Sequence, residues 1–304
     1  AEAAYKTALV LDPGMASLHS GMAKVLLEKG ASAEAAEELR QALAKDANDP
    51  DLLSHQLFSL NYLPGSSPAE MAEIARRYGE AIRANIAPFA TWQCPAEAER
   101  KLRIGMVSGD LRRHPVGYLL RGPLREIDKS GCEIFAYSNY PLEDDLSAEL
   151  RQHFAGWANV SETSDAELAR RIHDDRIDIL LDLSGHTDFS RLAVFARKSA
   201  PVQATWLGYF ATTGVREIDW KIGDPWVAPD AESGHFTEKL WRLPDSCFCF
   251  APPEGAPAVA ALPSERNGHV TYGCFNNLAK VNDAVIATWS RILHADPAAR
   301  LLLK

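Results

Sequence analysis

The sequence lacks the long apolar runs, paired cysteines and basic surplus that mark several large classes of protein. No apolar stretch approaches the roughly 18 residues that a membrane-spanning helix requires. The five cysteines form no C-x-x-C pair, which is typical of a reducing compartment and predicts neither a disulfide framework nor a zinc site. Lysine and arginine number 32 against 41 aspartates and glutamates, and the net charge of −9 disfavours nucleic-acid binding. We therefore expect a cytoplasmic protein with neither nucleic-acid nor membrane partners.

Catalytic motifs of three common enzyme classes are also missing. The dinucleotide fingerprint G-x-G-x-x-G is absent, which disfavours a nicotinamide enzyme. The nucleophile elbow G-x-S-x-G is absent, which disfavours a hydrolase of that type. The histidines are scattered, and His186 with the nearby Asp182 and Asp188 shows no H-x-x-x-H or D-x-D spacing, so no metal site is expected.

The first 50 residues have a helical pattern with few strand formers. Small residues such as Gly21 at the helix crossing, and Pro50 just past the second helix, are typical of a tetratricopeptide repeat with a period of about 34 residues. An ordinary helical hairpin is the alternative. Because a repeat needs neighbours to cover its apolar faces, we expect Ala1 to be an engineered or proteolytic boundary rather than a natural start.

From Lys101 onward, short apolar runs alternate with amphipathic segments, which predicts an α/β fold with a parallel sheet covered on both faces. The predicted strands are 102–108, 133–138, 177–183, 202–207, 220–222, 239–243, 270–274 and 301–303. The predicted helices are 115–127, 146–154, 165–172, 192–198 and 283–293. We expect a repeat region at 1–50, a helical connector at 51–99, a Rossmann-like lobe at 100–260, and at 261–304 the start of a second lobe continuing past Lys304.

Ligands of such sheets bind at the carboxyl ends of the strands, so the loops there are the candidates for chemistry. In the first loop, His114 precedes Pro115 at a predicted helix start. Its imidazole could act as a base or bond a phosphate oxygen, beside the cations of Arg112 and Arg113. The alternative is a histidine that only caps its helix, with both arginines in solvent.

Three further loops carry polar or aromatic candidates, each with a structural alternative. His186 and Thr187 could contact a sugar or acceptor, or satisfy their own loop. Tyr209 and its aromatic neighbours Trp206 and Phe210 could pack on a sugar face, or belong to the core.

The fourth loop ends at Lys280, whose ammonium could meet a pyrophosphate or be a solvated surface charge. Without any resemblance, these loops predict a helical interaction repeat joined to a two-lobed α/β enzyme with an anion-binding cleft.

Three segments resemble one family and occur in its order: Leu102–Asp110 with His114 and Pro115, Ala200–Tyr209, and Cys274–Asn277 with Lys280. The chain is similar from its repeat to its C-terminus to the O-GlcNAc transferases, which join tetratricopeptide repeats to a GT-B glycosyltransferase. The resemblance implies transfer of N-acetylglucosamine from UDP-GlcNAc to Ser or Thr hydroxyls of proteins, with inversion and with no metal or cofactor. It also implies protein contacts through the repeats and a nucleotide-binding second lobe. The short segment 250–270, where animal enzymes carry a long insertion, indicates a bacterial relative.

The resemblance also implies roles for single residues. His114 matches the histidine favoured as general base, Asp110 a nearby aspartate, and His55 a second histidine proposed as base. Lys280 matches the lysine that contacts the diphosphate, and Asn277 stands where animal enzymes carry Gln. The candidate substrate-binding residues are Arg113, His186, Thr187, Leu207, Gly208, Tyr209, Asn277 and Lys280.

Among these, Leu207 and Gly208 match backbone contacts to the sugar ring. Arg113, Val116 and Phe210 stand where animal enzymes carry Asn, Thr and Pro. These departures leave open a repeat-based binding scaffold with a degenerate transferase lobe. A UDP-sugar transferase that acts on a non-protein acceptor is a further alternative.

Overall fold

The fold is given by a computed structural model in which residues 1–95, 97, 99–127, 131–252 and 255–304 are described. The chain divides into two compact units, one of residues 1–47, 59–66 and 252–304 and the other of residues 48–58 and 67–251. Each unit is described by itself. Within the described residues, no helix has both the length and the apolar character needed to cross a membrane.

The N-terminal region is a series of helices: α1 (Glu2–Leu11), α2 (Ala16–Glu28) and α3 (Ser32–Lys45). Helices α2 and α3 pack through the small side chains of Ala23 and Ala35 together with Leu39. Gly21 lies against the Tyr5 ring, where an added Cβ would come within 2.4 Å of a ring carbon, so α1 and α2 approach closely. The connector forms α4 (Pro50–Leu60) and α5 (Pro68–Arg83).

A seven-stranded parallel sheet with the order β3-β2-β1-β4-β5-β6-β7 forms the centre of the second unit. Its strands are β1 (Arg103–Ser108), β2 (Glu133–Ser138), β3 (Gly156–Asn159), β4 (Ile179–Asp182), β5 (Val202–Thr205), β6 (Trp220–Gly223) and β7 (Lys239–Arg242). The winding direction reverses between β1 and β4. Strand β3 is an addition to the predicted strands. It is a four-residue edge strand that contains Gly156 and Asn159, two residue types that are rare in strands.

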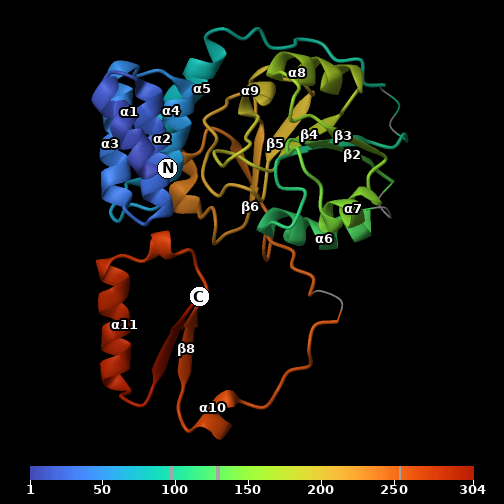
Figure 1. Cartoon of the computed structure of the whole chain (residues 1–304). Helices are drawn as coiled ribbons and strands as arrows, with labels where there is room; N and C mark the ends of the chain where they lie inside the picture. The colour runs from blue at the N-terminus through green and yellow to red at the C-terminus, as the bar shows by residue number, and fades with distance from the viewer. Residues whose placement is uncertain (96, 98, 128–130, 253–254) are drawn as a thin grey trace. The chain divides into compact units, whose positions relative to one another are not determined.

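Helices cover both faces of this sheet (Figure 1): α6 (Pro115–Ile127) and α7 (Asp145–Arg151) lie on one face, α8 (Asp165–Asp174) and α9 (Leu192–Ala196) on the other. Leu120 and Leu124, one turn apart on α6, are fully buried against Met106 of β1 and Leu181 of β4. Each such leucine stabilises the fold by about 2 kcal/mol through burial of apolar surface. The packing fixes the ends of β1 and β4, from which the candidate loops begin.

The C-terminal segment contains a second, separate parallel pair of strands. It runs α10 (Pro263–Asn267), β8 (Thr271–Cys274), the 3-10 helix η3 (Leu278–Lys280), α11 (Asp283–Ala295) and β9 (Arg300–Leu303). Asn282 caps α11, because its side-chain oxygen accepts the amide of Val285 at 3.1 Å. The predicted strand–helix–strand order of this segment is therefore present.

Candidate active site

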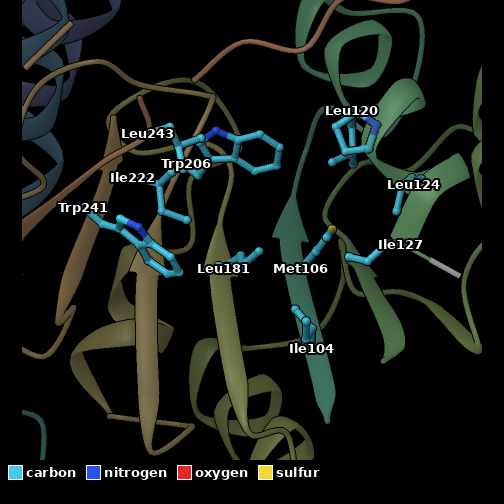
Figure 2. Close-up of a pocket in the computed structure, with 11 residues that line it drawn as sticks. Ile104, Met106, Leu120, Leu124, Ile127, Leu181, Trp206, Ile222, Trp241 and Leu243 are labelled. Atoms are coloured by element: carbon cyan, nitrogen blue, oxygen red, sulfur yellow. The ribbon is translucent and has the colours of Figure 1, made fainter. Parts of the chain in front are cut away.

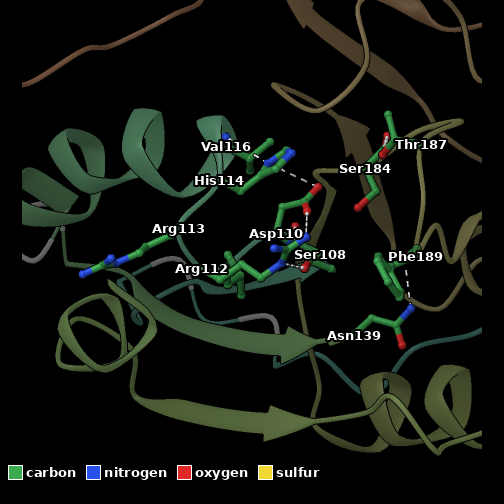
Figure 3. A network of polar contacts seen from close by, with 12 residues as sticks. Ser108, Asp110, Arg112, Arg113, His114, Val116, Asn139, Ser184, Thr187 and Phe189 are labelled. Carbon is green, nitrogen blue, oxygen red and sulfur yellow. Dashed lines mark hydrogen bonds and ion pairs between the residues drawn. The ribbon is translucent and has the colours of Figure 1, made fainter. Parts of the chain in front are cut away.

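The loops that follow β1 and β4 leave the sheet where the strand order reverses, the position at which open α/β sheets form a crevice. Val107 pairs with Asp182 in the register of these two strands, so both loops begin at one level. The loops also touch, since a Cβ added to Gly109 would lie 2.4 Å from the Cβ of Phe189. This edge of the sheet brings together the loops that carry Asp110, His114 and Ser184, as Figure 3 shows.

Asp110 and His114 form the central pair of the first loop. Asp110 is 4% exposed, and its Oδ2 lies 3.5 Å from Nδ1 of His114. The amide of Asp110 donates to the Ser108 hydroxyl at 2.9 Å, which fixes the turn after β1. Nδ1 of His114 faces both the Asp110 carboxylate and the Val116 amide, which lies 3.4 Å away. In the tautomer that carries its proton on Nδ1, Nε2 has the free lone pair that a general base needs.

Burial sets the protonation of this pair. It lowers the pKa of His114, an effect that the Asp110 carboxylate opposes and the Arg112 guanidinium reinforces. Burial raises the pKa of Asp110, and Asp188 adds to this, while His114 and Arg112 act in the other direction. The imidazole of His114 is therefore neutral at pH 7 and able to accept a proton.

The two arginines of the first loop take different directions. Arg112 lies 4.1 Å above the Tyr140 ring and donates to the Gly109 carbonyl at 3.1 Å, so it stays beside the turn. Arg113 points away from His114 and pairs with Asp145 (Figure 3). The structure therefore groups Arg112, but not the expected Arg113, with the site.

The loop after β4 adds Ser184, which was not among the predicted site residues. Ser184 is 1% exposed, and its hydroxyl has no hydrogen-bond partner within the described part of the chain. Asp182 accepts the amides of Ser184 and Gly185, and the Thr187 hydroxyl donates to the Ser184 carbonyl at 2.8 Å. A serine in a turn belongs to no spacing motif, so no sequence pattern points to Ser184.

His186, expected to contact substrate, is instead packed inside the unit. It is 2% exposed, with Nδ1 2.9 Å from the Ser54 hydroxyl and Nε2 2.9 Å from the Thr213 carbonyl. The Tyr78 ring meets it edge to face at 4.6 Å. Burial lowers the pKa of His186 to about 4. Its contacts hold α4 and α5 against the loops after β4 and β5.

The turn after β5 has a strained backbone. Leu207 has a φ of 71°, which is rare for a residue with a side chain. A Cβ on Gly208 would lie 1.9 Å from the Leu183 carbonyl oxygen, so glycine is required there. Tyr209 is buried and Phe210 is 55% exposed. Of the aromatic residues, Tyr209 therefore joins the core and Phe210 faces outward.

Trp206 lines a cavity on the face of the sheet that α6 covers (Figure 2). This cavity has a volume of about 230 Å³, and Trp241, Met106 and Leu181 are among its apolar lining residues. The indole nitrogen of Trp206 donates to the Cys247 carbonyl at 2.9 Å. Because the lining side chains are apolar, we assign this cavity to packing rather than to the site.

The remaining candidates lie elsewhere. His55 is exposed on α4. Asn277 builds the turn that carries Lys280: its side chain accepts the Ala279 amide at 2.9 Å, and its carbonyl accepts the Lys280 amide at 3.0 Å. Lys280 is exposed at the end of η3. Across the described residues, no group of three or more His, Cys, Asp or Glu side chains is arranged to hold a metal ion.

Two family models match the chain: "Glycosyl transferase family 41" at residues 72–251 and "Tetratricopeptide repeat" at residues 1–54. A relative from Hordeum vulgare, "Probable UDP-N-acetylglucosamine--peptide N-acetylglucosaminyltransferase SPINDLY", is 34% identical over 84% of this chain and 28% of its own. The SEC protein of Arabidopsis thaliana, with the same probable activity in its name, is 29% identical over 88% of this chain and 29% of its own. The chain thus spans under a third of these relatives.

A solved structure, a mutant O-GlcNAc transferase of Thermobaculum terrenum, matches with a TM-score of 0.92 and 35% sequence identity. The match covers 99% of this chain and 57% of that chain. A solved relative therefore contains both the helical repeats and the α/β lobe, in the same order along its chain.

Proposed function

Because the chain belongs to glycosyl transferase family 41, the family of the O-GlcNAc transferases, we propose that the protein transfers N-acetylglucosamine from UDP-GlcNAc to Ser or Thr hydroxyls of proteins. The observation that carries the proposal is the pair of Asp110 and His114 at the reversal point of the sheet. The names of the relatives support UDP-GlcNAc as the donor, and the repeats at residues 1–54 support proteins as the acceptors.

The proposed reaction is a direct displacement at the anomeric carbon. A serine or threonine hydroxyl is a weak nucleophile near pH 7, so Nε2 of His114 takes its proton while the oxygen attacks. One C–O bond forms as the bond to UDP breaks on the opposite side, which inverts the anomeric centre. The Asp110 carboxylate stabilises the imidazolium that results. His55, exposed on α4, is the second candidate base.

Substrate binding is proposed for Lys280 and for the loops after β4 and β5. The departing UDP gains negative charge, which the ammonium of Lys280 stabilises, and Asn277 holds the turn that carries this lysine. The backbone of Leu207 and Gly208 contacts the sugar ring, next to Tyr209. Thr187 and the orphaned Ser184 hydroxyl lie in the loop that follows the adjacent strand β4.

The test is transfer of radiolabelled GlcNAc to a peptide array by the full-length protein. Transfer should be lost in His114→Ala and in Lys280→Ala, and kept in a control, His173→Gln, whose ring stacks on Phe89 away from these loops. Full activity in both site variants contradicts the assignment. Binding of UDP in calorimetry with no transfer to any peptide would instead favour a scaffold or a non-protein acceptor.

A further inference from the structure

A row of buried polar side chains crosses the sheet beneath the loops after β4 and β5. Asp182, Thr205 and Lys221 stand next to one another in the register of β4, β5 and β6. Each is at most 1% exposed, and the Thr205 hydroxyl donates to Asp182 at 2.7 Å. Asp182 in turn holds the amides at the start of the β4 loop. The reaction proposed above gives no role to Lys221.

The ammonium of Lys221 donates to the backbone carbonyl of Tyr209. Burial lowers the pKa of Lys221, and the carboxylates of Glu238 and Asp182 oppose this effect. A buried cation costs more free energy than an apolar side chain of similar size, so packing alone does not account for a lysine here. The hydrogen bond to Tyr209 is what this cation adds.

The far end of the same loop is fixed by a second buried charge. Glu238 accepts the Thr212 hydroxyl at 2.7 Å and the Thr213 amide at 2.8 Å. The Thr213 carbonyl lies 2.9 Å from the His186 ring. The loop is therefore held on both sides of Phe210, which is itself exposed.

Between β5 and these attachments lies the strained turn at Leu207, with its φ of 71°. A non-glycine residue persists in this region only where its surroundings hold it there. Tyr209 is two residues further on, so the Lys221 hydrogen bond is the nearest of these buried attachments to the turn.

We propose that Lys221 is a positioning residue, which holds the Leu207–Tyr209 turn in the shape that binds the sugar of the donor. It acts through the Tyr209 carbonyl and does not touch substrate. The inference rests on the proposed function, because that function assigns the sugar contact to Leu207 and Gly208.

The test compares Lys221→Met with Lys198→Met in the full-length protein. Lys198 is a matched control: it donates to the Glu217 carbonyl at 2.9 Å and pairs with Asp219, but it lies at the amino-terminal edge of β5 and β6. Loss of a charge-assisted hydrogen bond should raise KM for UDP-GlcNAc about tenfold in Lys221→Met. Inhibition by UDP alone should not change, because UDP lacks the N-acetylglucosamine group that the turn is proposed to bind.

Two further variants and one structural readout complete the design. Lys221→Arg, which keeps a cationic donor, should restore most of the donor affinity, and Lys221→Gln decides the outcome if Lys221→Met does not fold. Amide exchange in the peptide covering residues 206–214 should rise in Lys221→Met but not in Lys198→Met. This exchange reports on the turn whether or not sugar is transferred.

Each outcome decides a separate question. A wild-type protein that transfers no sugar refutes the proposed function, and the inference falls with it. An active wild type whose Lys221 variants keep the donor KM, or keep the exchange of residues 206–214, refutes the inference alone. An equal loss of UDP and UDP-GlcNAc affinity also refutes it, because a turn that binds only the sugar cannot affect UDP.

Discussion

The protonation of His114 is the residue-level property that should set the pH dependence of transfer. A general base must be neutral, so kcat/KM should decrease at low pH, where the imidazole takes a proton. Burial lowers the pKa of His114, which places this fall below the ordinary value near 6.5. The Asp110 carboxylate raises that pKa, so Asp110→Asn should lower it further. We expect the acid limb of the profile to move to lower pH in Asp110→Asn, with a reduced maximal rate.

Asp145→Asn is the matched control for this pH profile. Its carboxylate pairs with Arg113, whose side chain points away from His114. The acid limb should stay in place in this variant. An acid limb that moves to higher pH in Asp110→Asn, or not at all, would contradict the role given to Asp110.

The orphaned hydroxyl of Ser184 should contribute to ligand binding rather than to the stability of the fold. Its oxygen is buried without a partner in the described part of the chain, so Ser184→Ala removes no native hydrogen bond and should change the free energy of unfolding by less than about 1 kcal/mol. If a substrate group satisfies this oxygen, KM for UDP-GlcNAc should rise about tenfold. Steady-state kinetics and denaturant unfolding measure the two effects. Ser190→Ala, another orphaned hydroxyl in this loop region, should leave KM unchanged.

Single residues were predictable where local sequence decides their place. His114 precedes Pro115 after a strongly apolar strand, so a helix start beside the sheet edge follows from four neighbouring residues. His186 differs because its partners, Ser54 and Thr213, lie 132 and 27 residues away. No local pattern separates a histidine that packs between distant segments from one that faces a ligand.

At the scale of elements, His186 links the helical connector to the sheet loops and should make their association sensitive to acid. Its pKa is about 4 in the fold, below the ordinary value of 6.5, so the unfolded chain binds more protons between these values. The contribution of the neutral His186 to the free energy of unfolding is fully present above pH 6.5. It decreases by at most about 3 kcal/mol as the pH falls toward 4. Chemical denaturation across this range measures the loss. It should shrink in His186→Gln but persist in His173→Gln.

The contact between α5 and the loop after β5 depends on Gly79, a residue without a side chain. A Cβ on Gly79 would lie 1.9 Å from the Gly214 carbonyl oxygen, a backbone atom that cannot move alone. Gly79→Ala should therefore destabilise the unit by about 1–3 kcal/mol, the typical cost of overpacking. Thermal unfolding measures this. Gly234→Ala, where nothing lies within 4 Å of the added Cβ, should have a small effect, and equal effects would contradict the interpretation.

Elements were predictable in proportion to their length and periodicity. The helix 115–127 and the strand 133–138 have the predicted bounds, because each buries a regular apolar set. Strand β3 was missed because four residues, among them Gly156, are too few to show a period. The turn at Leu207 could not be predicted as strained, since leucine gives no indication of a positive φ.

For the whole molecule, the sequence predicted a helical repeat followed by an α/β lobe, and both are confirmed by the seven-stranded parallel sheet and by the family models. The alternation of strands and helices determines the parallel sheet, because each crossover helix must cover a face. The order β3-β2-β1-β4-β5-β6-β7 does not follow from alternation. It depends on which strand edges meet, which is a property of the folded sheet.

Two residues far apart in the sequence should make separable contributions to the proposed activity. Lys280 is proposed to bind the diphosphate and His114 to move a proton, so their substitutions should fail in different ways. Lys280→Met should weaken UDP binding about tenfold or more in calorimetry, because it removes a charge-assisted contact. His114→Asn should leave UDP binding unchanged and reduce transfer at least about a hundredfold. Arg266→Met removes an exposed cation from α10, in the same unit as Lys280, and should change neither. If His114→Asn weakens UDP binding as much as Lys280→Met does, His114 is a binding residue for the nucleotide and the assignment of a base falls to His55.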